Sequence, residues 1–355
     1  MRCNRFSVTI PAMIVAGIDE AGYGPLLGPL VISAAAFRTP AATSATPATA
    51  LPPTSLPADA DLWTPLSAAI IRKPPVAGGK LIVADSKIVH ALANGPTLLE
   101  HTVLAFTRTL CRNSSPSPDS PPGPPAADTL QQLLLSLGQV PEPVFAQPWY
   151  QAAGALPRFS SAAIGPSANF LARTLYSADI TPVALRTRVI TEQEFNRLIG
   201  ITNNKASVLI GATFAHLAHL YHQFAAENLL VIIDKQGGRN HYLDLLLETF
   251  PQEHIKVLAE SNLWSGYVIT GTQRHARIYF LAKSESAGFA TALASMVCKY
   301  LREVLMNDLN HWFQRRIPSL AATAGYHQDG QRWLRDVRDH LPRIGVDPAQ
   351  LLRLR

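Results

Sequence analysis

Charged side chains are scarce in this chain of 355 residues, where they make up 16% of the sequence, and cysteine occurs only three times. The three cysteines are scattered and form no CxxC pair, which argues against a disulfide framework and fits a reducing, cytoplasmic compartment. No apolar run reaches the roughly 18 residues of a membrane span, so we expect no membrane association. Residues 1–12 are too short and too polar for a signal peptide, and we expect none.

Motifs for nucleotide cofactors and for zinc sites are also missing. The chain contains neither a Walker A sequence nor GxGxxG, and its 11 histidines show no HExxH or zinc-finger spacing. The formal net charge of +6 is modest, but its sign points toward a polyanionic partner. On charge alone, a basic protein without such a partner is the alternative.

Proline, by contrast, is abundant, and most of the 28 prolines fall into two windows, at residues 40–75 and 116–166. Segments of this composition bury too little apolar surface to offset the entropy that is lost when they become ordered. We therefore expect two proline-rich loop insertions, at about residues 39–79 and 112–168, in a domain that spans residues 13–313. Residues 314–355 are expected to form a C-terminal helical segment.

Outside these windows the hydrophobic pattern alternates between strand and helix. Strands are expected at residues 13–18, 30–37, 80–84, 185–190, 229–233 and 255–259, with an extra hairpin at about 263–282. Helices are expected at residues 96–110, 205–226, 240–250 and 287–313, and Thr191 with Glu194 forms a capping box that begins another. An α/β fold with a mixed central sheet flanked by helices is the natural assembly of these elements.

Several acidic residues stand where apolar strands end. Asp19 and Glu20 follow the run at 13–18, Asp234 follows 229–233, and Glu285 follows 278–282. Open sheets place reactive groups at strand ends, and carboxylates gathered there cannot all stay ionised without cations. Because Mg²⁺ and Mn²⁺ prefer oxygen ligands, the pattern predicts a divalent-metal site. The alternative is that each acid is a solvated strand terminus.

Asp19 and Glu20 raise a geometric difficulty because they are neighbours. Adjacent residues of a regular strand point to opposite faces of the sheet. We therefore expect the two carboxylates to converge only if the strand breaks there, which the following Ala21 and Gly22 would permit.

The residues around these acids resemble a known family. The stretch Gly17-Ile18-Asp19-Glu20-Ala21-Gly22, continued by Gly24-Pro25-Leu26 and Gly28-Pro29, is similar to the signature of ribonuclease HII, the type 2 ribonuclease H. Further segments are similar to that family in the same order along the chain: Asp85-Ser86-Lys87, and residues 189–196, 232–234, 283–286, 294–299 and 325–326. The first motif is specific to the family. The other segments are individually weak, but they support the resemblance because they occur in the same order as in the family.

The resemblance implies an RNase H-like fold and an endoribonuclease that uses two Mg²⁺ or Mn²⁺ ions. Its substrate would be the RNA strand of RNA–DNA hybrids or a ribonucleotide embedded in duplex DNA, and its products would carry 3′-hydroxyl and 5′-phosphate ends. The catalytic and metal-binding residues would be Asp19, Glu20, Asp234 and Glu285. The candidate substrate-binding residues are Gly22, Tyr23, Gly24, Lys87, Lys299 and Tyr326, and the tail at 314–355 would pack on or near the substrate site.

Two residues depart from the family pattern. Glu285 stands where the family has aspartate, and its extra methylene moves the carboxylate by roughly one bond length. Tyr23 replaces the arginine of a Gly-Arg-Gly loop that contacts the 2′-hydroxyl. The alternatives are therefore a nuclease of the same fold acting on DNA or a structured nucleic acid, a non-catalytic nucleic-acid-binding protein, and a phosphotransferase. We expect a monomer, because nothing in the sequence indicates an obligate partner.

Overall fold

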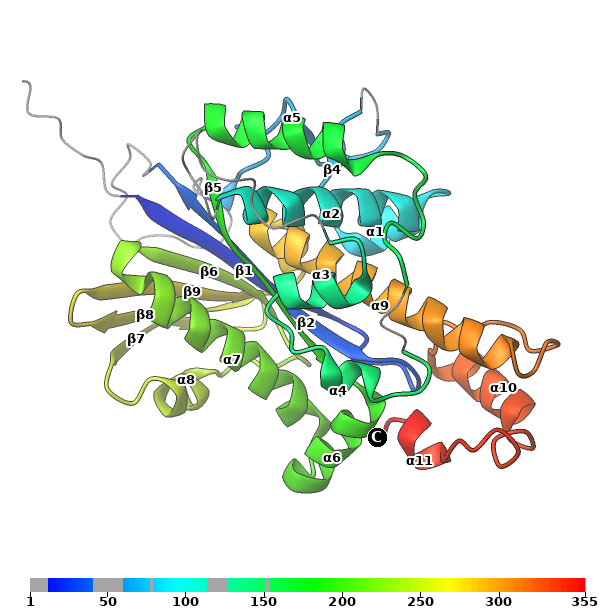
Figure 1. The fold of residues 1–355 in the computed structure, drawn as a ribbon. Coiled ribbons are helices and arrows are strands. Elements are labelled where there is room, and N and C mark those ends of the chain that lie inside the picture. The colour runs from blue at the N-terminus through cyan, green and yellow to red at the C-terminus, as the bar shows by residue number, and fades with distance from the viewer. Residues whose placement is uncertain (1–11, 41–59, 77–78, 114–126, 151–153, 355) are drawn as a thin grey trace, which may run out of the picture.

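The computed structural model describes residues 12–40, 60–76, 79–113, 127–150 and 154–354. A seven-stranded sheet runs through its centre in the order β5-β2-β1-β6-β9-β8-β7 (Figure 1). Its strands are β1 (Met13–Ala21), β2 (Leu30–Thr39), β5 (Thr181–Ile190), β6 (Leu229–Asp234), β7 (His254–Glu260), β8 (Trp264–Gly271) and β9 (Arg274–Leu281). Strands β1, β6 and β9 are parallel to one another and the other pairs are antiparallel, so the predicted mixed sheet is confirmed.

Alternating side chains along the strands give the sheet two apolar faces, and helices cover both (Figure 1). On β2, Val31 and Ala35 pack in the same cluster as α9 (Phe289–Gln314) and α2 (Gly95–Asn113). Ile32 and Ala34 face the other way and pack with α7 (Lys205–Phe224). The predicted α/β architecture therefore follows from side chains that alternate between the two faces of each strand and from helices that each present an apolar face to the sheet.

The remaining elements are short or lie at the periphery of the sheet. They are β3 (Ile70–Ile71) and β4 (Leu81–Ile82), which pair with each other, and α1 (Ser86–His90), α3 (Leu130–Ser136), α4 (Glu142–Phe145), α5 (Ile164–Ser177), α6 (Glu192–Thr202), α8 (Leu243–Thr249), α10 (His327–Val337) and α11 (Pro348–Leu351). Thr191 caps α6 as predicted, because its hydroxyl accepts the Glu194 backbone N–H at 3.4 Å. None of the helices in the described ranges combines the length and the apolar character needed to cross a bilayer.

The proline-rich windows contain more structure than their composition suggests. Residues 41–59, 77–78, 114–126 and 151–153 lie outside the described residues. The described rest of the first window is mostly turns, as expected, apart from β3, whereas in the second window the prediction of a loop is wrong where helices form. Helices α3 and α4 form there, and Leu133, Trp149 and Tyr150 are buried in the main core, as are Leu62 and Leu66 of the first window. Short apolar runs between the prolines supply this burial, and a composition taken over the whole window hides them. The domain boundaries at 13–313 and 314–355 stay a prediction.

The predicted hairpin at 263–282 forms from β8 and β9, but it is not an appendage. Strand β9 lies between β6 and β8, with Asp234 level with Leu281, so it is an internal strand of the sheet. Arg274 begins β9 at the end of the sheet opposite Asp234. The chain after β9 is thereby brought next to the end of β6.

Candidate metal centre

The ends of β1 and β6 create an open edge at which acidic side chains meet. The two strands run parallel from the pair Ile14 and Leu229 to the pair Ile18 and Ile233. Strand β6 ends one residue later at Asp234, whereas β1 continues to Ala21 with only β2 beside it. By this register Asp19 is level with Asp234, and Glu20 stands beside the space into which β6 would have continued.

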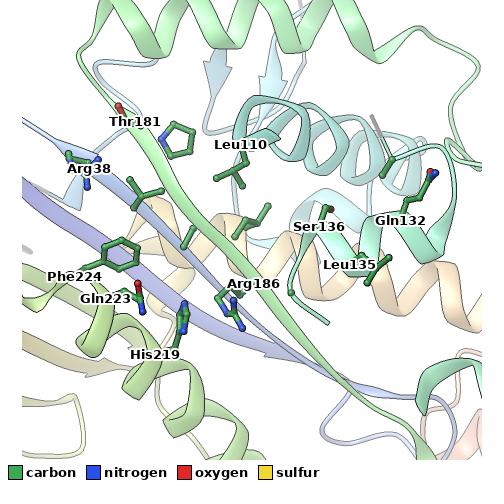
Figure 2. A pocket seen from close by; sticks show the side chains of 16 residues that line it. Arg38, Leu110, Gln132, Leu135, Ser136, Thr181, Arg186, His219, Gln223 and Phe224 are labelled. Carbon is green, nitrogen blue, oxygen red and sulfur yellow. The ribbon is translucent and has the colours of Figure 1, made fainter. Parts of the chain in front are cut away.

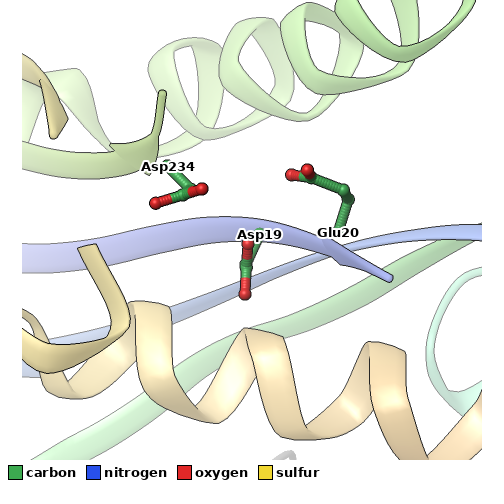
Figure 3. Close-up of side chains that lie close together, drawn as sticks. All are labelled: Asp19, Glu20 and Asp234. Atoms are coloured by element: carbon green, nitrogen blue, oxygen red, sulfur yellow. The ribbon is translucent and has the colours of Figure 1, made fainter. Parts of the chain in front are cut away.

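Three carboxylates from these two strands come together. Asp19, Glu20 and Asp234 each place one carboxylate oxygen so that all three atoms lie within 4.8 Å of one another. Figure 3 shows that the side chains of Asp19 and Glu20 leave β1 in opposite directions. The predicted strand break is wrong: β1 stays paired with β2 through both acids, and the carboxylates meet across the open edge instead.

Burial and mutual repulsion make it costly to ionise all three groups at once. Burial raises the pKa of Asp19 well above its usual range, and the charges of Glu20 and Asp234 raise it further. Burial and the charge of Asp234 raise the pKa of Glu20 to about 7. The pKa of Asp234 is raised by burial as well. A group of carboxylates with these properties is suited to a bound cation, which would favour the ionised form of each.

Two serines contact the aspartates. The backbone N–H and the hydroxyl of Ser284 both donate to Asp234 Oδ1, each at 3.1 Å. On α9, the Ser295 hydroxyl donates to the Ser86 hydroxyl at 2.9 Å and lies against the Asp19 side chain, where it lowers the pKa of Asp19. The Cys298 thiol donates to the Asp19 carbonyl at 3.2 Å. Sequence reasoning assigned no role to either serine, although both lie in segments that resemble the family. Their contacts depend on how α9 and the chain after β9 pack against β1 and β6.

Glu285 and Lys87 lie beside the three carboxylates without joining them. Glu285 is buried and its charge raises the pKa of Glu20, but it is not in the group whose oxygens lie within 4.8 Å of one another. Its Oε1 is 3.9 Å from Lys87 Nζ. Burial lowers the pKa of Lys87, but Glu285 and the neighbouring acids outweigh that effect and raise it, so the lysine stays charged. The role of Glu285 as a fourth metal ligand stays a prediction.

The turn after β1 carries the predicted sugar-reading residues. Gly22 has a φ of +87°, and a Cβ there would lie 2.5 Å from the Pro29 carbonyl oxygen, so this position requires glycine. A Cβ at Gly24 would meet nothing within 4 Å, which leaves its backbone open to a ligand. Between them, the Tyr23 ring centroid lies 4.6 Å from Lys205 Nζ on α7, so a cation lies beside the phenol.

Four distant segments hold this turn in place. Glu192 of α6 accepts the Gly28 N–H at 3.0 Å, and Arg302 of α9, which is 1% exposed, donates to the Leu27 carbonyl at 3.3 Å. The Gly325 carbonyl accepts the Leu26 N–H at 2.8 Å, and the Arg353 side chain donates to the Pro25 carbonyl. The C-terminal tail thus packs against the turn beside the three carboxylates. Arg302 and Arg353 are both buried, so they hold this turn in place instead of facing a ligand.

The last two predicted substrate contacts differ in accessibility. Tyr326 is 48% exposed at the start of α10, with the Arg302 guanidinium 5.3 Å from its ring centroid. Lys299 forms an ion pair with Glu303 at 2.7 Å, and its side chain is only 13% exposed. Tyr326 is therefore available to a ligand, whereas Lys299 is already engaged within the protein.

The hydrogen bonds of Ser284 lead to a first prediction. Ser284→Ala should weaken Mn²⁺ binding at this site by about 10-fold, because groups that orient metal ligands typically contribute 10- to 100-fold to affinity. The substitution removes the hydroxyl and leaves the backbone N–H bond to Asp234. Calorimetric titration with Mn²⁺ measures the effect, with Ser286→Ala as the matched control, because the Ser286 hydroxyl bonds only the Lys283 carbonyl. Equal affinities in the two variants would contradict the prediction.

Comparison with known proteins gives a distant likeness in structure. Neither models of protein families nor curated proteins match the sequence. Among solved structures, ribonuclease HII of Archaeoglobus fulgidus in its complex with PCNA is 12% identical, with 96% of this chain and 94% of that chain covered and a TM-score of 0.39. Ribonuclease H2 of Pyrococcus horikoshii is 12% identical, with 96% and 92% covered and a TM-score of 0.40. Bst-RNase HIII in complex with Mn²⁺ is 12% identical, with 97% and 67% covered and a TM-score of 0.37. A likeness this distant does not assign a substrate to this chain.

Proposed function

We propose that this chain is a divalent-metal-dependent endonuclease. It cuts the RNA strand of RNA–DNA hybrids, or a ribonucleotide embedded in duplex DNA, and leaves 3′-hydroxyl and 5′-phosphate ends. The observation that carries the proposal is the meeting of Asp19, Glu20 and Asp234 within 4.8 Å at an open strand edge. The stretch at residues 17–29, which resembles the ribonuclease HII signature, supports the choice of substrate.

The residues at this edge fit Mg²⁺ or Mn²⁺. Three carboxylates supply hard oxygen ligands, and in the described part of the chain none of the three forms a salt bridge with a lysine, arginine or histidine. Asp19, Glu20 and Asp234 would hold the ions, with Glu285 as the proposed fourth ligand. When bound, such ions would supply the activation of a water molecule and the stabilisation of the departing oxygen that phosphodiester hydrolysis requires.

The chain's own residues then bind and orient the substrate. Ser284 fixes Asp234 through its backbone N–H and its hydroxyl, so that little reorganisation of this carboxylate is needed when substrate arrives. Lys87, which is held beside Glu285 with its side chain 85% exposed, can contact a phosphate. The open backbone at Gly24 can approach the 2′-hydroxyl, and the Tyr326 ring can stack on a sugar or base next to the cleaved bond.

The raised pKa of Glu20 predicts that metal-free protein loses stability as pH rises. The pKa is about 7 in the folded protein against 4.5 in the unfolded chain, so the folded state binds this proton more tightly. The resulting stabilisation is fully present below the pKa that Glu20 has in the unfolded chain, and it is lost as pH rises through the pKa that Glu20 has in the folded protein. Between pH 5 and pH 8 we expect a loss on the order of 1–3 kcal/mol, which added Mg²⁺ or Mn²⁺ restores at pH 8.

Urea unfolding of metal-free wild type and Glu20→Gln at both pH values measures this loss. The glutamine variant cannot ionise at position 20, so its stability should change less with pH. The same change in both proteins would contradict the assigned pKa shift.

Substrate choice tests the proposed function. The purified chain is incubated with duplex DNA carrying one ribonucleotide, with a long RNA–DNA hybrid and with all-DNA duplex, each in Mg²⁺, in Mn²⁺ and in EDTA. We expect cutting of the first two substrates, only with metal. Tyr23 favours a second candidate, because the loop lacks the family's arginine. Equal cutting of all-DNA would establish that candidate, a nuclease of this fold that does not read the 2′-hydroxyl, and no cutting of any substrate would reject both.

A further inference from the structure

The outer strand of the sheet is covered along only half of its length. Strand β5 is the last strand on the β2 side. Toward its C-terminal end, the Leu137 carbonyl accepts the Thr187 N–H at 2.9 Å and the Gln139 side chain accepts the Val189 N–H at 2.8 Å. Leu185 lies two residues before Thr187, so its backbone also points away from β2. In the described part of the chain, no hydrogen bond reaches that outer side at Leu185.

A groove of about 930 Å³ follows the uncovered half of β5 (Figure 2). One wall comes from α2 and α3, through Leu110 and Leu135, and the other from α7, through His219 and Phe224. The floor is the strand itself from Thr181 to Arg186. The groove thus borders a strand edge between two partly apolar walls, where the outer side of Leu185 is unpaired among the described residues and Pro182 has no N–H to offer. A strand edge is the setting in which an extended peptide adds to a sheet.

The charges of the groove indicate what kind of peptide it would accept. Its lining includes Arg38, Arg186 and His219 and no aspartate or glutamate. Arg38 is already bound through two nitrogens by Glu227, at 2.6 and 2.9 Å. Arg186 has no salt bridge within the described residues and lies half-buried at the strand edge. An incoming segment with carboxylates would supply the missing partner.

From these observations we infer that the N-terminal half of β5 is a docking site for an extended, acidic peptide segment of a partner protein. The segment adds to the sheet as a strand beside Leu185, and one of its carboxylates pairs with Arg186. A single-stranded nucleic acid fits less well for two reasons. The groove offers only one arginine that lacks a salt bridge among the described residues, and the backbone carbonyls of β5 cannot donate hydrogen bonds to phosphates. The proposal is independent of the nuclease function.

The docking site is separate from the three carboxylates. Strand β2 lies between β5 and β1, and Ala184 is level with Ala36, which is level with Ala16, three residues before Asp19. A peptide in the groove would therefore leave the open edge at Asp19 accessible. Such an arrangement would let a partner protein recruit the chain without blocking its substrate.

Fluorescence anisotropy tests the inference with a labelled peptide of about eight residues in which glutamate and valine alternate. We expect the full chain to bind this peptide, and Arg186→Glu to weaken binding by at least 10-fold, with a smaller loss in Arg186→Gln. Arg197→Glu makes the same charge change on an exposed face of α6 and should leave binding unchanged. Unchanged nucleic-acid cleavage or an unchanged unfolding midpoint would show that the Arg186 variants are folded.

Three further probes separate strand addition from other modes. The same peptide with alternate backbone amides N-methylated, and a peptide with lysine in place of glutamate, should both bind at least 10-fold more weakly. Equal binding of either one would overturn the proposal, as would equal peptide binding by Arg186→Glu and wild type. Two other results would overturn it: binding of a single-stranded oligonucleotide that Arg186→Glu weakens to the same extent, or self-association of the chain in sedimentation that depends on Arg186 in the same way.

Discussion

Asp19→Asn is expected to lower the rate of ribonucleotide-dependent cleavage by about 1,000-fold or more while the protein stays folded. Asp19 is buried at the meeting point of the three carboxylates, and an amide in its place binds Mg²⁺ or Mn²⁺ far less well. Removing one of three mutually repelling charges should leave the metal-free protein as stable as wild type or more stable. Single-turnover cleavage and thermal unfolding measure the two effects.

The matched control for Asp19→Asn is Asp244→Asn. Asp244 is exposed on α8, so the substitution makes the same change in charge and shape away from the open strand edge. Its cleavage rate should equal that of wild type. Full activity of Asp19→Asn would reject the site. If Asp19→Asn loses both activity and folding, its inactivity reflects unfolding, and Asp234→Asn then provides the second test.

Gly17→Ala is expected to destabilise the protein by about 3 kcal/mol, at the upper end of the range for overpacked cores. A Cβ at Gly17 would lie 2.1 Å from the backbone nitrogen of Thr291 and 2.5 Å from its Cα. Thr291 lies in the first turn of α9 and its hydroxyl donates to the Ile232 carbonyl at 3.1 Å, so the helix cannot move without losing contact with β6. Because α9 also carries Ser295 to Asp19, cleavage should slow as well.

Urea unfolding of Gly17→Ala measures this loss, and Gly211→Ala is its control. Gly211 lies in α7, where a Cβ would meet nothing within 4 Å. Alanine there should be neutral or stabilising by up to about 1 kcal/mol, because glycine is the poorer helix former. Equal unfolding midpoints for the two variants would contradict the close packing of α9 on β1.

The elements that position the site were predictable because their patterns are long or wholly apolar. Strands β1, β2 and β6 and helix α9 all form within a few residues of their expected bounds. Helices α3 and α4 were missed for different reasons. In α3, Leu130, Leu133, Leu134 and Leu137 recur at helical spacing and Thr129 forms a capping box with Gln132, but the proline-rich composition of the window as a whole obscured these signals. Helix α4 is a single turn that carries no periodic pattern. The internal position of β9 was also hidden, since a hairpin pattern does not say which of its strands pairs with the rest of a sheet.

Of the four acids that the sequence assigned to the site, the structure brings three together and leaves Glu285 beside them. Asp19, Glu20 and Asp234 were singled out because they follow apolar strands, and the structure brings them together. The expected strand break was wrong, because the early end of β6 leaves an open edge that only the register of the two strands reveals. The contacts of Ser284 and Ser295 arise between segments that are distant in sequence. The ion pair of Lys299 joins two side chains that are one helical turn apart. No pattern along the chain encodes the two serine contacts.

Binding of Mn²⁺ to the purified, metal-free chain is the direct test of a metal site at Asp19, Glu20 and Asp234. Calorimetric titration at pH 8, where the pKa of about 7 leaves Glu20 mostly ionised, is carried out on wild type, Asp19→Asn, Asp234→Asn and Asp244→Asn. The account predicts saturable binding to wild type and Asp244→Asn that is lost or weakened at least 10-fold in Asp19→Asn and Asp234→Asn. Equal binding in all four proteins, or no binding in wild type, would contradict it.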